Sequence, residues 1–508
     1  MADMLAEHYD VIIIGTGAGG GTMAHALAPT GARILVIERG DFVPQEDANW
    51  DPEAVWKHLR YRATERWLDA DGREFLPYMH YGVGGNSKFW GAVLYRLRRE
   101  DFLQLEHVDG LSPAWPIAYE TLAPYYDRAE RLYSVHGQAG VDPTDPVREA
   151  FPHPAVPHAP RIGELVDALR AQGLHPSPLP LGLRDPGAPE GCRLCNTCNS
   201  FPCRILAKSE ADACCVRPAL THGNVTLATR TMARRLVTNA TGTRVEGVDV
   251  ERDGVSSRVR APLVVVSCGA VQSAALLLRS ASDQHPDGLG NSSGLVGRRY
   301  MAHLATMLQG FDPRRVNDTV FQKTVAINDF YFGSPASPYP LGHIQSQGRT
   351  HGVMAQTVVP WLPLWAYDAW VARGVDWLVM SEDLPRLDNR VTLEADGQIR
   401  LSYRPTNVRT HDMLVRHWSK VLKGLGFWLV VTHSHRAKNT THQCGTLCFG
   451  DNPRSSVLDP YCRSHDVENL FVVDASFFPS SAAVNPALTI VAQALRVADH
   501  IVDTHLRH

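Results

Sequence analysis

Long apolar segments and a dominant charge are both absent from this sequence of 508 residues. No run of eighteen consecutive apolar residues occurs, which argues against a membrane-spanning helix. Acidic and basic residues nearly balance, with a formal net charge of -3 and a pI near 6.8. The net charge is therefore too small to create an electrostatic field that would attract nucleic acid or a membrane surface. Residues 1–8 lack the basic region of a signal peptide, so we expect a cytoplasmic location.

The composition is that of an ordinary globular protein, with 44% apolar and 20% charged residues. With 508 residues, the chain is too long to fold around one small hydrophobic core. Its length predicts two or three domains, or one large composite domain. The ten cysteines do not predict a disulfide framework, because the cytoplasm keeps thiols reduced.

A glycine-rich segment near the N-terminus carries the first functional signal. Gly15, Gly17 and Gly20 form a G-x-G-x-x-G pattern between a predicted buried strand at 9–14 and a predicted helix at 22–27. In this context the backbone turns tightly and approaches a pyrophosphate at the helix N-terminus. Glu38 closes the next predicted strand, where an acid binds a ribose hydroxyl and repels the 2'-phosphate of NADP.

The remaining pattern predicts an α/β fold with a Rossmann-like parallel sheet and a second, antiparallel sheet. Residues 263–266 followed by a helix at 274–278 predict a further strand and helix of the parallel sheet. Residues from about 301 to 405 alternate and show few helix signals, and Asp396-Gly397 predicts a hairpin. We expect a cofactor domain made of 8–300 and 432–508, which includes the cysteine cluster, and an inserted substrate domain at 301–431.

The order of motifs resembles the glucose-methanol-choline (GMC) family of FAD oxidoreductases over nearly the whole chain. Any one motif is weak, but six in the right order are strong. The matching pieces are Gly15 to Gly20 with Glu38, the loop Gly82 to Gly91, Gly269-Ala270-Val271-Gln272-Ser273, Gly294-Leu295-Val296-Gly297-Arg298, His442-Gln443-Cys444-Gly445-Thr446, and Phe471 to Ser476 leading to Asn485-Pro486-Ala487-Leu488-Thr489.

This resemblance implies a flavin held by both ends of the chain. Its pyrophosphate would lie on the first helix and its adenosine ribose at Glu38. The isoalloxazine ring would lie beside a second glycine-rich loop, which carries Gly85, Asn86 and Trp90. Asp474 and Ala475 would lie near the cofactor. Phe89 stands where relatives with covalent flavin carry histidine, so we expect non-covalent FAD.

The resemblance also implies the chemistry, which is oxidation of an alcohol with hydride passing to flavin N5. A base must take the hydroxyl proton as the hydride leaves, and His442 suits this task because an imidazole titrates near neutrality. Asn485 would donate a hydrogen bond to the same oxygen. Oxygen or another electron acceptor would reoxidise the flavin. The alternatives are a lyase of this family, an electron-transfer subunit serving a cytochrome-type partner, and an NAD enzyme using the same glycine turn.

Four cysteines form a cluster that the resemblance explains least. Cys192, Cys195, Cys198 and Cys203 differ from a bacterial ferredoxin run by one residue in the last gap. They predict an iron-sulfur cluster, with structural zinc and reduced buried thiols as the alternatives.

The residues that could indicate the kind of substrate lie between positions 361 and 388. Four tryptophans occur there, and aromatic faces suit the C–H faces of sugars, although clustered tryptophans are usually core. Glu382, Asp383 and Asp388 can meet a cationic amino sugar, and we interpret them as a solvated turn. With Asn485, these features favour a sugar, glycoside or aminoglycoside-like substrate of secondary metabolism.

Overall fold

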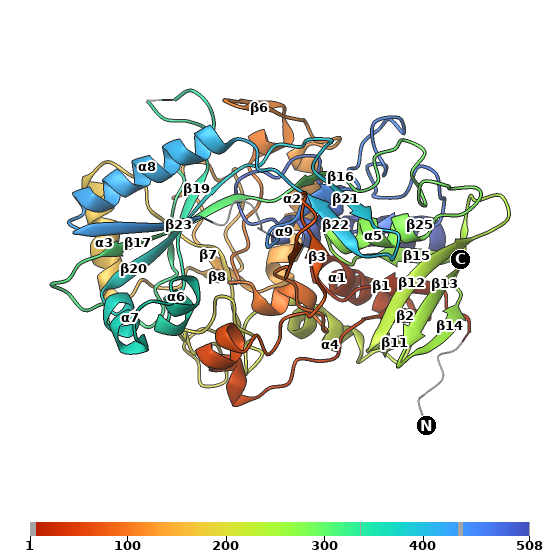
Figure 1. Cartoon of the computed structure of the whole chain (residues 1–508), viewed down its shortest axis with the longest axis horizontal. Coiled ribbons are helices and arrows are strands. Elements are labelled where there is room, and N and C mark those ends of the chain that lie inside the picture. Colours follow the sequence, from red (N-terminus) through yellow and green to blue (C-terminus); the bar gives the residue numbers. More distant parts are fainter. Residues whose placement is uncertain (1–6, 336, 435–439, 507–508) are drawn as a thin grey trace.

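A computed structural model of the chain describes residues 7–335, 337–434 and 440–506. Figure 1 shows a parallel sheet with its helices in one half of the molecule and an antiparallel sheet under the long helix α8 in the other half. The predicted α/β fold class is confirmed. None of the helices in the described part of the chain has the length and apolar character needed to span a bilayer.

The parallel sheet has five strands in the order β11-β2-β1-β15-β25. Its three inner strands, β2, β1 and β15, are fully buried runs of Val, Ile and Leu, as expected when helices cover both faces of a parallel sheet. β1 pairs in parallel with β2 and β15, and β15 pairs with β25. The strands comprise Val11–Ile14 (β1), Ile34–Ile37 (β2), Val225–Ala228 (β11), Leu263–Val266 (β15) and Leu470–Val472 (β25).

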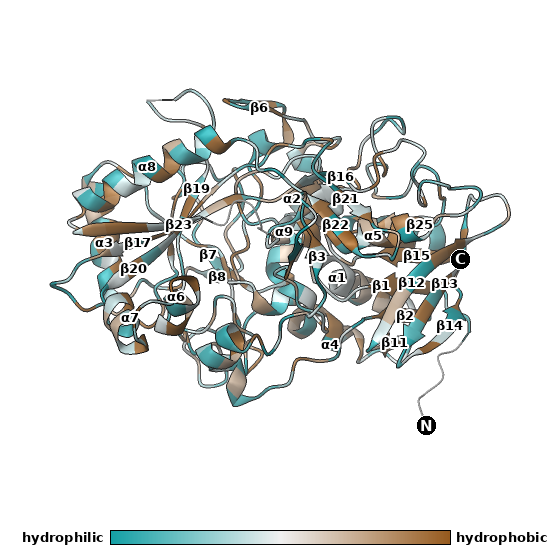
Figure 2. Ribbon diagram, in the orientation of Figure 1, coloured by the Kyte–Doolittle hydropathy of each residue, from teal (hydrophilic) through white to brown (hydrophobic). Residues whose placement is uncertain are grey.

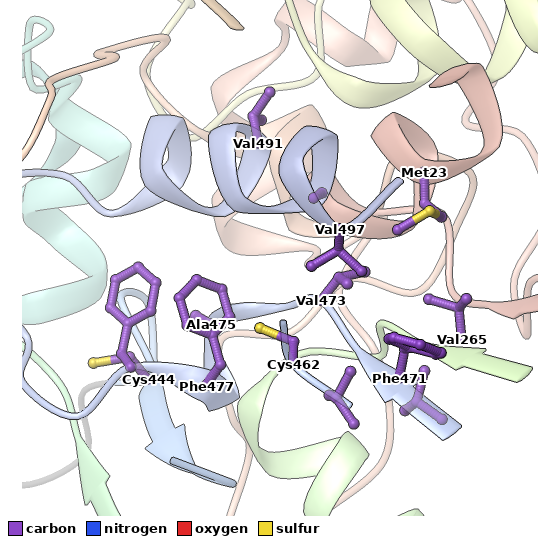
Figure 3. Close-up of a cluster of buried hydrophobic side chains, with 14 of the residues drawn as sticks. Met23, Val265, Cys444, Cys462, Phe471, Val473, Ala475, Phe477, Val491 and Val497 are labelled. Atoms are coloured by element: carbon purple, nitrogen blue, oxygen red, sulfur yellow. The ribbon is translucent and has the colours of Figure 1, made fainter. Parts of the chain in front are cut away.

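Helices α1 (Ala18–Leu27), α5 (Ala270–Arg279) and α9 (Ala487–Ile501) belong to the same core. Figure 3 shows Met23 of α1, Val265 of β15 and Phe471 of β25 close to Val497 of α9. All four side chains are fully buried. The first and last segments of the chain therefore share one core, and neither can be removed without exposing the other.

The antiparallel sheet has the order β23-β17-β20-β19-β18-β9. One face packs against α3 (Pro160–Ala171) and α8 (Val408–Gly424), where Trp377 and Trp418 meet edge to face at 4.9 Å between ring centroids. Strands β17 and β23 are largely hydrophobic in Figure 2, whereas α8 mixes polar with apolar positions. The strands comprise Ser177–Pro178 (β9), Leu304–Phe311 (β17), Val325–Ile327 (β18), His343–Ser346 (β19), Gly374–Ser381 (β20) and Leu429–Ser434 (β23).

A third sheet, with the order β24-β16-β21-β22-β3-β4, joins segments that are far apart in sequence. The predicted hairpin is present as β21 and β22, but it lies in this sheet rather than beside the substrate strands. The domain boundaries at 300 and 432 stay a prediction. The strands comprise Trp67–Leu68 (β3), Glu74–Phe75 (β4), Arg298–Met301 (β16), Arg390–Leu393 (β21), Ile399–Ser402 (β22) and Cys444–Thr446 (β24).

Smaller elements complete the described fold. Three short sheets have the orders β10-β7-β8, β12-β13-β14 and β5-β6. The remaining bounds are Leu105–His107 (β5), Gly110–Ser112 (β6), Val135–Gly137 (β7), His153–Pro154 (β8), Leu181–Gly182 (β10), Thr231–Thr238 (β12), Val245–Arg252 (β13), Val255–Val259 (β14), Tyr119–Leu132 (α2), Arg217–Ala219 (α4), Gly352–Val358 (α6) and Leu364–Val371 (α7).

The tryptophans of the predicted substrate region divide between core and surface. Trp377 is fully buried, and Trp370 stacks on Phe311 at 4.1 Å between ring centroids. Trp361 and Trp365 are 87% and 73% exposed, on and beside the turn between α6 and α7. The alternating pattern had not indicated these two helices.

Replacing Trp418 with alanine should lower the free energy of unfolding by about 3–5 kcal/mol, because it leaves a large cavity under α8. Trp428, which is 72% exposed, is the matched control, and its replacement with alanine should change stability by less than about 0.5 kcal/mol. Denaturant unfolding of both variants checks this, and equal losses would contradict the proposed packing.

Candidate active site

A cavity of about 960 Å³ lies at the carboxyl ends of the parallel strands and reaches the antiparallel sheet. Gly15, Glu38 and Ser267 follow directly after β1, β2 and β15, and Asp474 follows two residues after β25. All four line the cavity. The carboxyl edge of a doubly wound sheet is where such folds bind their ligands.

Three helices begin at this cavity, and in none of them does the side chain of the N-cap residue cap the helix. Residues at the N-termini of α1, α5 and α9 line the cavity, and none of the three first turns carries an acidic residue. The N–H groups of the first turn and the helix dipole leave a positive potential at the starts of α1 and α9. At the start of α5, Asp474 accepts a hydrogen bond from the Gly269 N–H and Gln443 accepts one from the Val271 N–H. The starts of α1 and α9 together suit an anionic ligand such as a pyrophosphate.

The three motif glycines in the turn after β1 have different structural roles, as the motif predicts. Gly15 has a φ of +101°, and a Cβ there would lie 2.2 Å from the carbonyl oxygen of Ser267. At Gly17 a Cβ would meet nothing within 4 Å, which leaves open space for a ligand. Gly20 does not line the cavity; its Cβ would lie 2.0 Å from the oxygen of Gly15, so this glycine permits close packing of the helix.

Glu38 is buried at the end of β2 and lines the cavity. Its carboxylate accepts a hydrogen bond from Thr16 Oγ1 at 2.6 Å and another from the Gly40 N–H at 3.0 Å. Burial raises the pKa of Glu38, and these two donors oppose the rise. The position fits the predicted contact with a ribose hydroxyl.

The second glycine-rich loop forms the wall opposite the turn. A Cβ on Gly85 would lie 3.3 Å from the Cα of Gly17, so the two loops adjoin. Asn86 accepts a hydrogen bond from the backbone N–H of His80 at 3.0 Å, and the His80 ring stacks on Phe89. Asn86 and Trp90 also line the cavity. The loop is therefore a cavity wall and not a surface turn.

Asp474 and Ala475 lie where β25 ends. Asp474 accepts hydrogen bonds from Ser273 Oγ, from the Gly269 N–H at 3.0 Å and from the Ser476 N–H at 2.9 Å. The carboxylate thus fixes the start of α5 against the end of β25, beside the cavity.

His442 is oriented by a second histidine, His303, which the sequence pattern did not indicate. β16 and β24 are antiparallel with Met301 opposite Cys444, and His303 and His442 each lie two residues beyond this pair, outside the two strands. Their Nδ1 atoms are 2.9 Å apart, and His303 Nε2 lies 3.0 Å from the carbonyl oxygen of Ser481.

This chain of contacts assigns the tautomers. His303 Nε2 carries a proton because it can only donate to the Ser481 carbonyl, so its Nδ1 accepts from the Nδ1–H of His442. The Nε2 lone pair of His442 is then available on the cavity side. Burial, followed by the neighbouring charges of His303 and Lys323, lowers the pKa of His442 well below 6.5. The ring is neutral at pH 7 and can accept a proton.

Asn485 precedes α9 and lines the same cavity. Its Oδ1 is buried and has no hydrogen-bond partner in the described part of the chain. A buried amide oxygen without a partner is costly unless a ligand satisfies it. This orphaned atom, the open space at Gly17 and the N-termini of α1 and α9 together fit a large anionic cofactor with a polar ring.

The cysteine cluster differs from the predicted metal centre. Cys192, Cys195, Cys198 and Cys203 surround a second, very small cavity. Across the described residues, no group of three or more His, Cys, Asp or Glu side chains is arranged to hold a metal ion. Burial raises the pKa of Cys192 to about 12, which keeps this thiol protonated. The prediction of an iron-sulfur cluster is therefore not supported.

Comparisons with known proteins agree with this geometry. Two family models described as GMC oxidoreductase match residues 9–305 and 388–494. Paromamine 6'-oxidase of Streptomyces fradiae and 6'''-hydroxyparomomycin C oxidase of Streptomyces lividus are each 32% identical, covering 98% of this chain and 93% of theirs. Pyridoxine 4-oxidase from Mesorbium loti has a similar fold, with a TM-score of 0.68 at 18% identity over 98% of this chain and 100% of that one.

Protein purified without oxygen should contain far less than one iron or zinc atom per chain and no matching sulfide, because the thiols are not arranged as ligands. Elemental and labile-sulfide analysis measures this. Stoichiometric iron and sulfide that disappear when Cys192 and Cys195 are both replaced by serine would contradict the assignment.

Proposed function

Because the chain belongs to the GMC oxidoreductase family, we propose that it uses non-covalent FAD to oxidise a hydroxyl group of an amino sugar or related sugar to a carbonyl. The observation that carries this proposal is the hydrogen bond between His303 and His442. It leaves a neutral imidazole, whose Nε2 has no hydrogen bond to any described residue, in a cavity suited to a dinucleotide.

The residues that would hold FAD come from both ends of the chain. Gly15 and Gly17 would admit the pyrophosphate at the start of α1, and Glu38 would bind the adenosine ribose. Trp90 would lie beside the ring, with Asp474 and Ala475 nearby. Bound FAD supplies an acceptor for the hydride that leaves the substrate carbon.

His442 would remove the hydroxyl proton through Nε2. The proton bound at Nε2 gives an imidazolium whose Nδ1–H still donates to His303, so the ring keeps its orientation during the step. His303 in turn stays fixed by the Ser481 carbonyl. Asn485 would donate through its side-chain amide to the same substrate oxygen, which holds the oxygen near the base.

The antiparallel sheet supplies a polar wall that suits a sugar. Side chains that line the cavity include Gln309, Gln347 and Asp376, together with the apolar Met307 and Leu378. The Oε1 atom of Gln347 is buried and has no described hydrogen-bond partner. Such a mixture of amide groups and apolar surface matches the hydroxyl groups and C–H faces of a sugar ring.

Asp376 supports a positively charged substrate. Its carboxylate accepts hydrogen bonds from Gln309, Gln322 and Thr350, all of which are neutral. Among the described residues no cation forms an ion pair with it. An ammonium group in this part of the cavity would be attracted to the carboxylate. The two Streptomyces relatives are named as oxidases of paromamine and 6'''-hydroxyparomomycin C, which supports the same class.

We extend the proposal to the organisation of the chain. Residues 8–300 and 432–508 would form the part that holds the cofactor, and 301–431 would form the substrate-binding part.

Replacing His442 with alanine should slow reduction of bound FAD by substrate about 10²–10⁴-fold, since a positioned general base contributes about that much. FAD should stay bound, because His442 is not among the residues that fasten it. Loss of the visible flavin band after anaerobic mixing with paromamine-like amino sugars measures the rate.

The matched control is His222→Ala, which removes an exposed histidine and should leave the rate unchanged. Reduction of the His442→Ala protein at the wild-type rate would show that another group takes the proton. Wild-type protein that binds FAD but is not reduced by any sugar would contradict the proposed substrate class.

A further inference from the structure

A buried lysine lies in the cavity, and the reaction described above does not use it. Lys323 precedes β18, lines the cavity and is 2% exposed. Its Nζ donates a hydrogen bond to Asn199 Oδ1 at 2.8 Å. Within residues 7–335, 337–434 and 440–506 no carboxylate lies within 4.0 Å of Nζ to form an ion pair. An amine without a compensating carboxylate is expensive to bury.

The Lys323 amine touches the loop that would lie beside the flavin ring. A Cβ on Gly91 would lie 1.8 Å from Nζ, so the amine occupies the space above this glycine. Gly91 follows Trp90, and both line the cavity. A larger residue at position 91 would displace the Lys323 amine. The absence of a side chain at Gly91 therefore makes room for this amine.

The cysteine segment holds Lys323 in place. Asn199 follows Cys198, and a second buried lysine fixes this segment to the flavin loop. Lys208 Nζ donates to the carbonyl oxygens of Lys88 at 3.0 Å, Trp90 at 2.9 Å, Cys198 at 2.9 Å and Phe201 at 2.6 Å. The segment therefore forms a rigid wall that presents the Asn199 oxygen to the amine.

The charges around Lys323 do not neutralise it. The groups that act on it include the Cys198 thiol and the Lys208 ammonium, which repels its charge. His442, whose pKa Lys323 helps to lower, is neutral. Burial raises the pKa of that thiol, so it carries no negative charge at pH 7. Burial lowers the pKa of Lys323 to about 7. A negative charge brought into this part of the cavity would restore the ammonium form and be stabilised by it.

We propose that Lys323, held by Asn199 against Gly91, stabilises the negative charge that the bound flavin gains on reduction and so raises its reduction potential. This inference rests on the proposed function, because it requires FAD beside the loop that ends at Gly91. Lys323 does not exchange a proton with the substrate in this account. Its contribution is a positive charge fixed near the ring.

The test compares reduction potentials of the FAD-loaded proteins by equilibration with a reference dye. Lys323→Met keeps most of the side-chain volume and removes the charge. It should lower the ratio of reduced to oxidised flavin at a given potential at least tenfold, which is about 30 mV for a two-electron couple. Lys323→Arg should retain most of the wild-type potential. Lys420→Met, which removes an exposed lysine, should cause no shift.

A Lys323→Met protein with the wild-type potential would overturn the inference. If this variant does not fold, Asn199→Ala provides the second test, because it releases the amine and should shift the potential in the same direction; an unchanged potential there would also overturn it. The dye replaces the substrate, so a protein that binds FAD but oxidises no sugar would contradict the proposed function alone.

Discussion

The pairing of β15 with both β1 and β25 is the constraint on which the site depends. It places strands from residues 11, 263 and 470 side by side in parallel, so their carboxyl ends share one edge. Gly15, Ser267 and Asp474, which follow these strands, line the same cavity as a result. The packing of α9 on α1 fixes the second end of the chain in the same core, so that Asn485 and the glycine turn line one cavity.

A second pairing fixes the reacting group. β16 and β24 pair antiparallel next to His303 and His442, the two rings share a hydrogen bond, and the Ser481 carbonyl determines which nitrogen of each ring carries a proton. The cavity thus combines positive helix N-termini at the cofactor end with a neutral imidazole at the substrate end. Burial of the cavity strengthens the interactions at both its cofactor end and its substrate end, because electrostatic interactions are stronger where water is excluded.

Local sequence patterns predicted the strand and the turn whose conformation depends mainly on neighbouring residues. The buried strand before Gly15 follows from an apolar run, and the structure confirms it. Glycine spacing and strand ends predicted roles for the turn and for Glu38, and both line the cavity. Contacts between distant segments were not predictable. His303 lies between β16 and β17, outside both strands, and only the folded chain brings it to His442. Glu382, expected in a solvated turn, is buried and pairs with His107 at 3.1 Å. The cysteine spacing resembled a metal motif, but burial and geometry decide its chemistry.

The most direct test is an experimental structure of the protein with FAD bound. The account predicts that the pyrophosphate lies at Gly17, that the ring lies beside Trp90, and that His442 Nε2 and the Asn485 amide face the reacting edge of the ring. One substrate carbon–oxygen unit should fit between the imidazole and the ring. A ring bound outside this cavity, or His442 turned away from it with Nε2 engaged elsewhere, would contradict the account.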